Sequence, residues 1–486
     1  MACTVTPPRM KFFRGLSPVA FLLLTWVLAL LLCRSYPVQS DEGYTLNAAW
    51  QVWSGLKMYD DFRLFVGPGA AYSVYWLWRI VGAPSFLAAR SLSLALSFSS
   101  ITVLYLLLRR AGVRGVVLAT TVVLWVSSSA LCVLLNHNSF SAFAASWFLL
   151  PYLRIVGGSG DADAGPPSRS AIWAGMAAGA VFVFVPMKGC WLVAAAIGFW
   201  LWISRGRGNS FRTVAALLAA FVAVIAPLFI VWRPATLVRN WVLIPLAGDY
   251  LGHTTAAGRY GLLAIAILLG MGWGARRLHD RTLGALAAVQ AALFMGTIHN
   301  LEPSHLAINA FPALVFAALA SERVIRAREG AAGRTSLPAT ALMALFAGAV
   351  AVWMAFTPGG RGSLEESTLY VDFVARPPRA PLASPRIAAA HAIYAGPFLP
   401  GLYYLFQKKN PFFVSETVVC DATCQRALVV ELAAVRPELA FLDYQMARSL
   451  HYDADGPVDV YLRDHYRRCP TPGVIEVRAL DPSWCP

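Results

Sequence analysis

Long apolar runs alternate with short polar connections along most of the 486-residue chain. A helix that crosses a hydrocarbon core of ~30 Å needs roughly twenty residues, and tilt or burial allows fewer, so the pattern predicts about eleven transmembrane helices. The sequence therefore predicts a mainly α-helical, polytopic membrane domain over residues 1–356. The expected spans are residues 18–33, 86–108, 116–135, 140–156, 171–186, 189–203, 214–232, 260–273, 283–298, 306–319 and 338–356.

Two longer polar stretches interrupt or follow these runs. In the first, residues 34–85, the segments 44–53 and 68–80 carry aromatic and apolar residues at helical spacing but are too short to span, which predicts interfacial helices. The second, residues 357–486, has short strand patterns at 392–394, 439–442 and 474–477. These alternate with helical patterns at 402–406, 422–435 and 458–468. That alternation predicts a small C-terminal α/β domain.

Composition and charge place these parts relative to a membrane. The chain is 58% hydrophobic and carries a net charge of +15. A nucleic-acid partner would require the basic residues on one soluble face, whereas here they lie in alternate connections between the apolar runs. The positive-inside rule therefore predicts a membrane protein with a cytoplasmic N-terminus and an extracytoplasmic C-terminal domain. The arginine-heavy basic set and abundant alanine favour a bacterial origin, and therefore the inner membrane. The first apolar run is also compatible with a cleaved signal peptide, and either alternative leaves Asp41 outside the cytoplasm.

Four of the eight cysteines, Cys420, Cys424, Cys469 and Cys485, fall in the C-terminal stretch. An even number of cysteines in an exported segment predicts disulfides, for which three connectivities remain open. A metal site is the alternative, but Cys420 and Cys424 have no second Cys or His pair at the required spacing.

Adjacent carboxylates, Asp41 and Glu42, directly follow the first span. One interpretation is a helix N-terminus, where the dipole favours negative charge. The other is catalytic, because a carboxylate at the membrane boundary can act as a general base toward an acceptor hydroxyl.

The surrounding motifs resemble the opening of GT-C superfamily membrane glycosyltransferases, the bacterial relatives of protein O-mannosyltransferases and aminoarabinose transferases. They are Asp41-Glu42-Gly43-Tyr44, Trp53-Ser54-Gly55, Met58-Tyr59-Asp60-Asp61-Phe62 and Ala88-Ala89-Arg90-Ser91-Leu92. The resemblance implies that Asp41 is the catalytic carboxylate and Glu42 its partner, with Tyr44, Asp61 and Arg90 as candidate substrate-binding residues. It also implies a polyprenyl-phosphate-linked sugar donor and a hydroxyl acceptor on a glycolipid, polysaccharide or protein. The sequence departs from the aminoarabinose transferases after Asp61, which argues against lipid A as the acceptor.

Few cations are expected on the outer side to stabilise a departing phosphate. Lys188 lies between two expected spans, and Arg259 closes the loop that contains the polar run 248–253. Glu302 and His305 form a further polar group before an expected helix and match an acidic-residue, His-Leu pattern of the relatives. Each residue also has a structural interpretation. Lys188 could be a lysine whose side chain extends to the interface, and Arg259 a solvated loop arginine. Glu302 could cap the helix that follows. A divalent metal is not specified by these residues.

Two other functions remain open from the sequence. A transporter or flippase would also have many spans, but would place ionisable residues near the membrane centre and have paired broken helices. The expected polar groups gather instead at the outer boundary, which favours an enzyme. A non-catalytic GT-C-like protein of envelope assembly is the second alternative.

Overall fold

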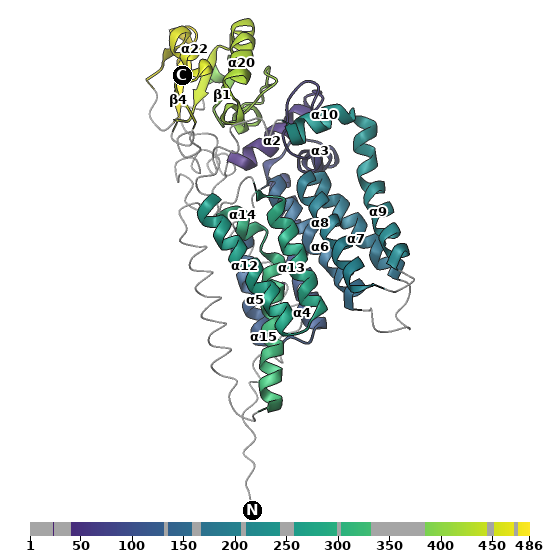
Figure 1. The fold of residues 1–486 in the computed structure, drawn as a ribbon. Coiled ribbons are helices and arrows are strands. Elements are labelled where there is room, and N and C mark those ends of the chain that lie inside the picture. The colour runs from purple at the N-terminus through teal and green to yellow at the C-terminus, as the bar shows by residue number, and fades with distance from the viewer. Residues whose placement is uncertain are drawn as a thin grey trace, which may run out of the picture.

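A computed structural model describes Leu23 and residues 40–130, 135–157, 167–205, 210–243, 257–298, 303–331, 384–444, 452–470 and 475–486. These residues form a helical bundle with a small α/β domain at one end, as Figure 1 shows. The domain boundary expected near residue 357 lies outside the described residues.

The bundle helices coincide with the apolar runs. They are α4 (Phe86–Arg110), α5 (Gly115–Ala130), α6 (His137–Gly157), α7 (Pro167–Phe184), α8 (Pro186–Ile203), α9 (Ser210–Val231), α12 (Ala257–Arg277), α13 (Arg281–Met295) and α15 (Phe311–Ala331). Within the described residues, four segments are long and apolar enough to cross a membrane: Ala88–Arg110, His137–Gly157, Pro186–Ile203 and Ser210–Val231. The expected spans 18–33 and 338–356 lie outside the described residues apart from Leu23, so the total of eleven stays a prediction.

One expected span is divided into two helices. Residues 306–319 do not form a single helix, because α14 (Pro303–Ile308) ends before α15 begins at Phe311. Pro312 has no backbone N–H, and inside a continuous helix its ring would clash with the carbonyl four residues earlier. Gln290 of α13 stabilises the break: its Nε2 donates to the Asn309 carbonyl at 2.9 Å, and its Oε1 accepts from the Ala313 N–H at 2.9 Å.

Arginine-rich connections meet at one end of the bundle. Glu322 of α15 binds Arg114, which follows α4, at 3.2 Å and Arg326 at 2.9 Å. Helix α4 rises about 30 Å between Arg90 and Arg110 at 1.5 Å per residue. The connection after α4 therefore lies at the opposite end of the bundle from Arg90.

Helices α2 (Ser40–Trp53) and α3 (Gly69–Val81) form as the sequence predicted for the interfacial segments. Figure 1 shows α2 between the bundle and the C-terminal domain, close to α3 and to the short helix α10 (Pro234–Val238). Element η3 (Arg239–Leu243) directly follows α10 in the chain. The loop between α2 and α3 lies directly on the end of α7. A Cβ on Gly67 would lie only 2.1 Å from the Val183 carbonyl oxygen, so this contact requires glycine.

The C-terminal domain contains a four-stranded sheet in the order β1-β2-β4-β3. Strand β1 (Ile393–Gly396) pairs in parallel with β2 (Leu439–Leu442), and β4 (Glu476–Ala479) is antiparallel to β2 and to β3 (Arg467–Arg468). The three strand patterns found in the sequence are all present. The expected helix 458–468 is shorter than predicted, since α22 (Pro457–His465) ends before β3. The other helical elements of the domain are α18 (Pro385–Ala389), α19 (Gly401–Leu405), η7 (Thr417–Val419), α20 (Ala422–Val435) and η8 (Pro482–Trp484).

Alternating side chains of the central strands build two separate cores. Leu439 and Phe441 of β2 face one core with Leu402 of α19, whereas Ala440 and Leu442 face the other with residues of α20 and α22. Successive residues of a strand point to opposite faces, so both faces of this sheet are covered.

Both cysteine pairs of the C-terminal domain form disulfides. Cys420 is joined to Cys424, and Cys469 to Cys485, which selects one of the three connectivities left open by the sequence. The second bridge ties the segment after η8 to the residue that follows β3.

Candidate functional site

The two adjacent carboxylates occupy the first turn of α2, where the helix dipole stabilises negative charge. Their environments differ. Glu42 is fully buried, and its two oxygens accept hydrogen bonds from Nε and Nη2 of Arg90 at 3.0 Å each. Burial raises the pKa of Glu42, and the charge and hydrogen bonds of Arg90 oppose that rise. The guanidinium also lies 4.6 Å from the centre of the Phe86 ring. Glu42 is therefore held in one place by α4.

Asp41 is only partly buried and lies near the start of α6. The side-chain Nδ2 of Asn136 donates a long hydrogen bond of 3.4 Å to Oδ2 of Asp41. The Oδ1 of the same asparagine accepts from the Ser139 N–H at 2.8 Å, as an N-terminal capping residue does. Asn136 thus joins the partly exposed carboxylate to the N-terminus of α6.

Lys188 lies in the first turn of α8 and is fully buried. Its Nζ donates to Oδ1 of Asn138 at 2.9 Å and to Oγ of Ser141 at 3.1 Å. A buried ammonium requires such partners because it has lost its hydration. Gly296, which follows α13, leaves the necessary room, since a Cβ there would lie 2.6 Å from Cγ of Lys188.

The amide of Asn138 also contacts two histidines. Its Nδ2 lies 3.1 Å from Nε2 of His137 and 3.1 Å from Nε2 of His305, which is on α14. An ammonium only donates hydrogen bonds, so the atom of Asn138 that faces Lys188 is the oxygen and the other is the nitrogen. Because that nitrogen donates, both imidazoles accept at Nε2 and are neutral with the proton on Nδ1.

The segment from Asn136 to Asn138 therefore connects a partly exposed carboxylate with a buried cation. A carboxylate can accept a proton from a hydroxyl, and a fixed cation stabilises an anion that develops during a reaction. The positive end of the α6 dipole adds a second favourable environment for an anion. This arrangement suits a transfer in which a hydroxyl attacks and a phosphate departs.

Four other candidates from the sequence lie elsewhere or outside the described part. Tyr44 is buried, and its hydroxyl accepts from the Phe65 N–H at 3.3 Å. Asp61 is exposed, and its carboxylate accepts from the Lys57 N–H at 2.7 Å, within its own turn. Arg259 belongs to the first turn of α12. Glu302 lies outside the described residues, among which no group of three or more His, Cys, Asp or Glu side chains is placed to hold a metal ion.

Asn136, Asn138 and Ser141 were not identified as site residues from the sequence. The available signal was the run Asn136-His137-Asn138, a short polar connection between two apolar runs. Uncharged polar residues in such a connection are ordinary, so only the contacts to Asp41 and Lys188 distinguish them.

No protein-family model matches the chain, and no curated protein matches it in sequence. Among solved structures, the chain is similar to ArnT from Cupriavidus metallidurans, in the apo state and bound to undecaprenyl phosphate. Both comparisons have a TM-score of 0.60 at 13% identity and cover 96% of this chain and 98% of ArnT. An oligosaccharyltransferase from Archaeoglobus fulgidus tethered with an acceptor peptide has a TM-score of 0.50 at 12% identity, over 96% of this chain and 74% of that protein.

These similarities extend over nearly the whole chain, including both the bundle and the C-terminal domain. At this level of identity they establish the fold. The chain shares the fold of ArnT, which is the fold expected from the resemblance to GT-C membrane glycosyltransferases.

Proposed function

We propose that this chain, which has the GT-C fold, transfers a sugar from a polyprenyl-phosphate-linked donor to a hydroxyl group of an extracytoplasmic glycolipid, polysaccharide or protein. The observation that supports this proposal is the connection between Asp41 and Lys188 through two asparagines of one short segment. It provides a proton acceptor and a cation at the same end of the bundle. The ArnT structure with bound undecaprenyl phosphate supports a lipid phosphate as the departing group.

In the proposed reaction Asp41 accepts the proton of the acceptor hydroxyl as its oxygen attacks the anomeric carbon of the donor. The new bond forms between that carbon and the acceptor oxygen. The bond between the anomeric carbon and the phosphate oxygen breaks, so the configuration inverts and polyprenyl phosphate departs. Asp41 then releases its proton to solvent. A single carboxylate is sufficient as the base because phosphate is already a good leaving group.

Lys188 is the residue that we assign to the departing phosphate. Its ammonium is fixed by Asn138 and Ser141 before the reaction, so little reorganisation is needed when negative charge develops. The neutral imidazole of His305, fixed by the same asparagine, offers its Nδ1 proton as a further donor without adding charge.

Glu42 has a different role in this proposal. Its carboxylate is fully buried and held by Arg90 in a two-point interaction, which is a poor arrangement for a base that must exchange protons with a substrate. The pair instead fixes the first turn of α2 against α4. Arg90 and Glu42 therefore position Asp41.

The proposal also includes an orientation in the membrane. We place the Asp41 end of the bundle and the C-terminal domain outside the cytoplasm of a bacterial inner membrane, with the N-terminus inside. The arginines around Glu322 support this orientation because they gather at the end of the bundle away from Arg90.

The test uses the full-length protein in lipid nanodiscs with a panel of polyprenyl-phosphate-linked sugars and envelope glycan acceptors. We expect transfer by the wild type and a loss of about a hundredfold to ten-thousandfold in Asp41→Asn, since a general base typically contributes 10²–10⁴-fold. Asp60→Asn is the matched control, because Asp60 is an exposed carboxylate in the same stretch, residues 34–85, which we call the first outer loop. Transfer that persists unchanged in Asp41→Asn would remove the mechanism.

A further inference from the structure

One segment of the C-terminal domain forms backbone hydrogen bonds with the first outer loop. The Lys408 carbonyl accepts from Nε1 of Trp50 at 2.7 Å, and the Asn410 N–H donates to Oε1 of Gln51 at 3.0 Å. Further along, the Phe413 carbonyl accepts from the Arg63 N–H at 2.7 Å. Three backbone groups within residues 408–413 thus bind to α2 or to the loop that follows it.

These contacts are buried and combined with ring packing. Gln51 is fully buried, and its Nε2 donates to Oδ1 of Asn47 one turn earlier at 2.7 Å. Tyr404 stacks on Trp78 of α3 at 5.3 Å and belongs to the core of the bundle rather than to either core of the C-terminal domain. Loss of a hydrogen-bond partner would leave a buried backbone group with its full desolvation free energy uncompensated by any bond. The contact between α2 and the C-terminal domain therefore depends on specific hydrogen bonds as well as on apolar packing.

A second contact lies close to the carboxylates. Tyr44 is one helical turn from Asp41, and its ring lies 6.3 Å from that of Phe398 in the C-terminal domain. Its hydroxyl interacts with the fully buried carboxyl group of Glu416, which Ser415 also binds. Both ends of α2 are therefore held by the same domain.

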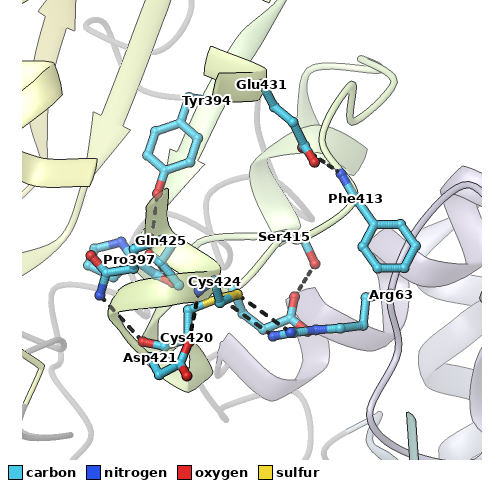
Figure 2. Close-up of a disulfide and its surroundings, with 12 residues drawn as sticks. Arg63, Tyr394, Pro397, Phe413, Ser415, Cys420, Asp421, Cys424, Gln425 and Glu431 are labelled. Carbon is cyan, nitrogen blue, oxygen red and sulfur yellow. Dashed lines mark hydrogen bonds between the residues drawn. A yellow bond between two sulfur atoms is a disulfide. The ribbon is translucent and has the colours of Figure 1, made fainter. Parts of the chain in front are cut away.

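Arg63, in the loop after α2, makes a further contact with the C-terminal domain. Figure 2 shows its guanidinium reaching from the first outer loop to the disulfide of the C-terminal domain. Nη1 lies 3.6 Å from Sγ of Cys424, and Nη2 lies 3.7 Å from Sγ of Cys420. The bridge between these cysteines thus forms part of the surface on which the loop rests.

We propose that residues 408–416 form a clamp that sets the position of α2, and that Trp50 and Gln51 are positioning residues for the carboxylate of Asp41. This inference rests on the proposed function for its catalytic part. Asp41 and Gln51 are ten positions apart in one α-helix, about 15 Å along its axis, so a displacement at one end moves the other. Misplacement of a reacting group by about 1 Å can cost on the order of a hundredfold in rate.

The test compares two variants of the full chain in nanodiscs. Gln51→Leu removes both side-chain hydrogen bonds at similar volume, and Trp50→Phe removes the indole N–H while keeping an aromatic ring. Deuterium uptake of the peptide that contains residues 40–53 is measured together with kcat and KM for the lipid-linked donor. Gln425→Leu is the matched control, because Gln425 is a buried glutamine whose Nε2 bonds to the Cys420 carbonyl within the C-terminal domain.

We expect faster exchange in α2 for both variants, with kcat reduced about tenfold or more and KM changed less than about threefold. Gln425→Leu should leave α2 exchange and kcat as in the wild type. Unchanged exchange in α2 in both variants would overturn the clamp, and faster exchange with unchanged kcat would overturn its positioning role. The exchange measurement does not depend on any sugar. A wild type that transfers no sugar therefore counts against the proposed function, while the clamp is still decided by exchange.

Discussion

Arg90 holds both carboxylate oxygens of Glu42 at 3.0 Å, with the glutamate side chain 0% and the arginine side chain 14% exposed. The pair joins α2 to α4 directly beside the candidate base. Two-point geometry fixes the carboxylate in orientation as well as in position. The stability of the outer end of the bundle therefore depends on this pair.

Removal of Arg90 alone should lower the stability of the folded protein. In Arg90→Ala, Glu42 must either stay charged without a partner or take up a proton, and removal of one member of a buried pair costs about 3–5 kcal/mol. We expect a clearly lower unfolding temperature in detergent, measured by intrinsic fluorescence. Arg90→Lys should recover only part of the loss because an ammonium cannot form the planar two-point contact.

Two further variants distinguish the loss of the ion pair from a nonspecific loss of stability. Glu42→Leu with Arg90→Met should unfold at a higher temperature than Arg90→Ala, because no buried charge remains. Arg110→Ala, which removes an exposed arginine at the far end of α4, should change little. An Arg90→Ala protein as stable as the wild type would contradict this account.

The charge of Lys188 should control the binding of a lipid phosphate. In Asn138→Asp a carboxylate replaces the amide oxygen 2.9 Å from Nζ, which neutralises the ammonium and removes the donor to both histidines. We expect binding of undecaprenyl phosphate, measured by native mass spectrometry, to weaken about tenfold or more. Ser141→Ala removes the hydrogen bond from Lys188 to Ser141 without adding charge and should have a smaller effect. Equal affinity for undecaprenyl phosphate in Asn138→Asp and the wild type would show that the charge of Lys188 does not contribute to phosphate binding.

Gly67 should tolerate no side chain. Its added Cβ would lie 2.1 Å from the Val183 carbonyl oxygen and 2.8 Å from that of Phe184, and backbone atoms at a helix end cannot move aside easily. We expect Gly67→Ala to destabilise the protein by about 3 kcal/mol, seen as a loss of monodisperse protein and a lower unfolding temperature. Gly198→Ala, within α8 with nothing inside 4 Å of the new Cβ, should be neutral or stabilising. A Gly67→Ala protein with normal stability would show that the loop does not rest on α7.

Asp459 should give the C-terminal domain a dependence on pH. Burial raises the pKa of this carboxyl group, although hydrogen bonds from the hydroxyls of Tyr452 and Tyr444 oppose the rise. The folded state therefore binds the proton more tightly than the unfolded state, whose pKa is about 3.9. Its contribution to stability is complete below that value and is lost as pH rises through the raised pKa.

The measurement is thermal unfolding of the full chain between about pH 4 and pH 8, with deuterium uptake of α22 as a local readout. Asp459→Asn should flatten the decline of stability with rising pH. Asp455→Asn is the control, since the Asp455 side chain is 83% exposed and its ion pair with Arg463 lies at the surface. Equal pH profiles for Asp459→Asn and the wild type would contradict the assignment.

Part of the candidate site could be predicted from sequence because it is local. Asp41 and Glu42 follow a long apolar run and precede an interrupted helical pattern, and the structure places them in the first turn of α2. Lys188 was identified because lysines are scarce between the apolar runs. Its partner Asn138 was not, because an asparagine in a short connection has no property that distinguishes it from an ordinary turn residue.

The sequence alone determined the approximate ranges of most helices in the described part of the bundle, since a segment in lipid must satisfy its own backbone and therefore needs a long apolar run. It also determined the three strand patterns of the C-terminal domain, through short alternating segments. It did not determine the break at Pro312 or the early end of α22. At both places a side chain or a strand partner from a distant segment takes the backbone hydrogen bonds.

Only the tertiary structure decided which residues meet. The pairing of Arg90 with Glu42, the contacts of Asn138 with Lys188 and His305, and the bond from Trp50 to the Lys408 carbonyl join segments between 48 and 358 residues apart. Such contacts leave no periodicity in the sequence, because a hydrogen bond requires only two compatible groups within about 3 Å of each other. The packing of helices around Gly67 and Gly296 brings those groups together, and that packing depends on the whole chain.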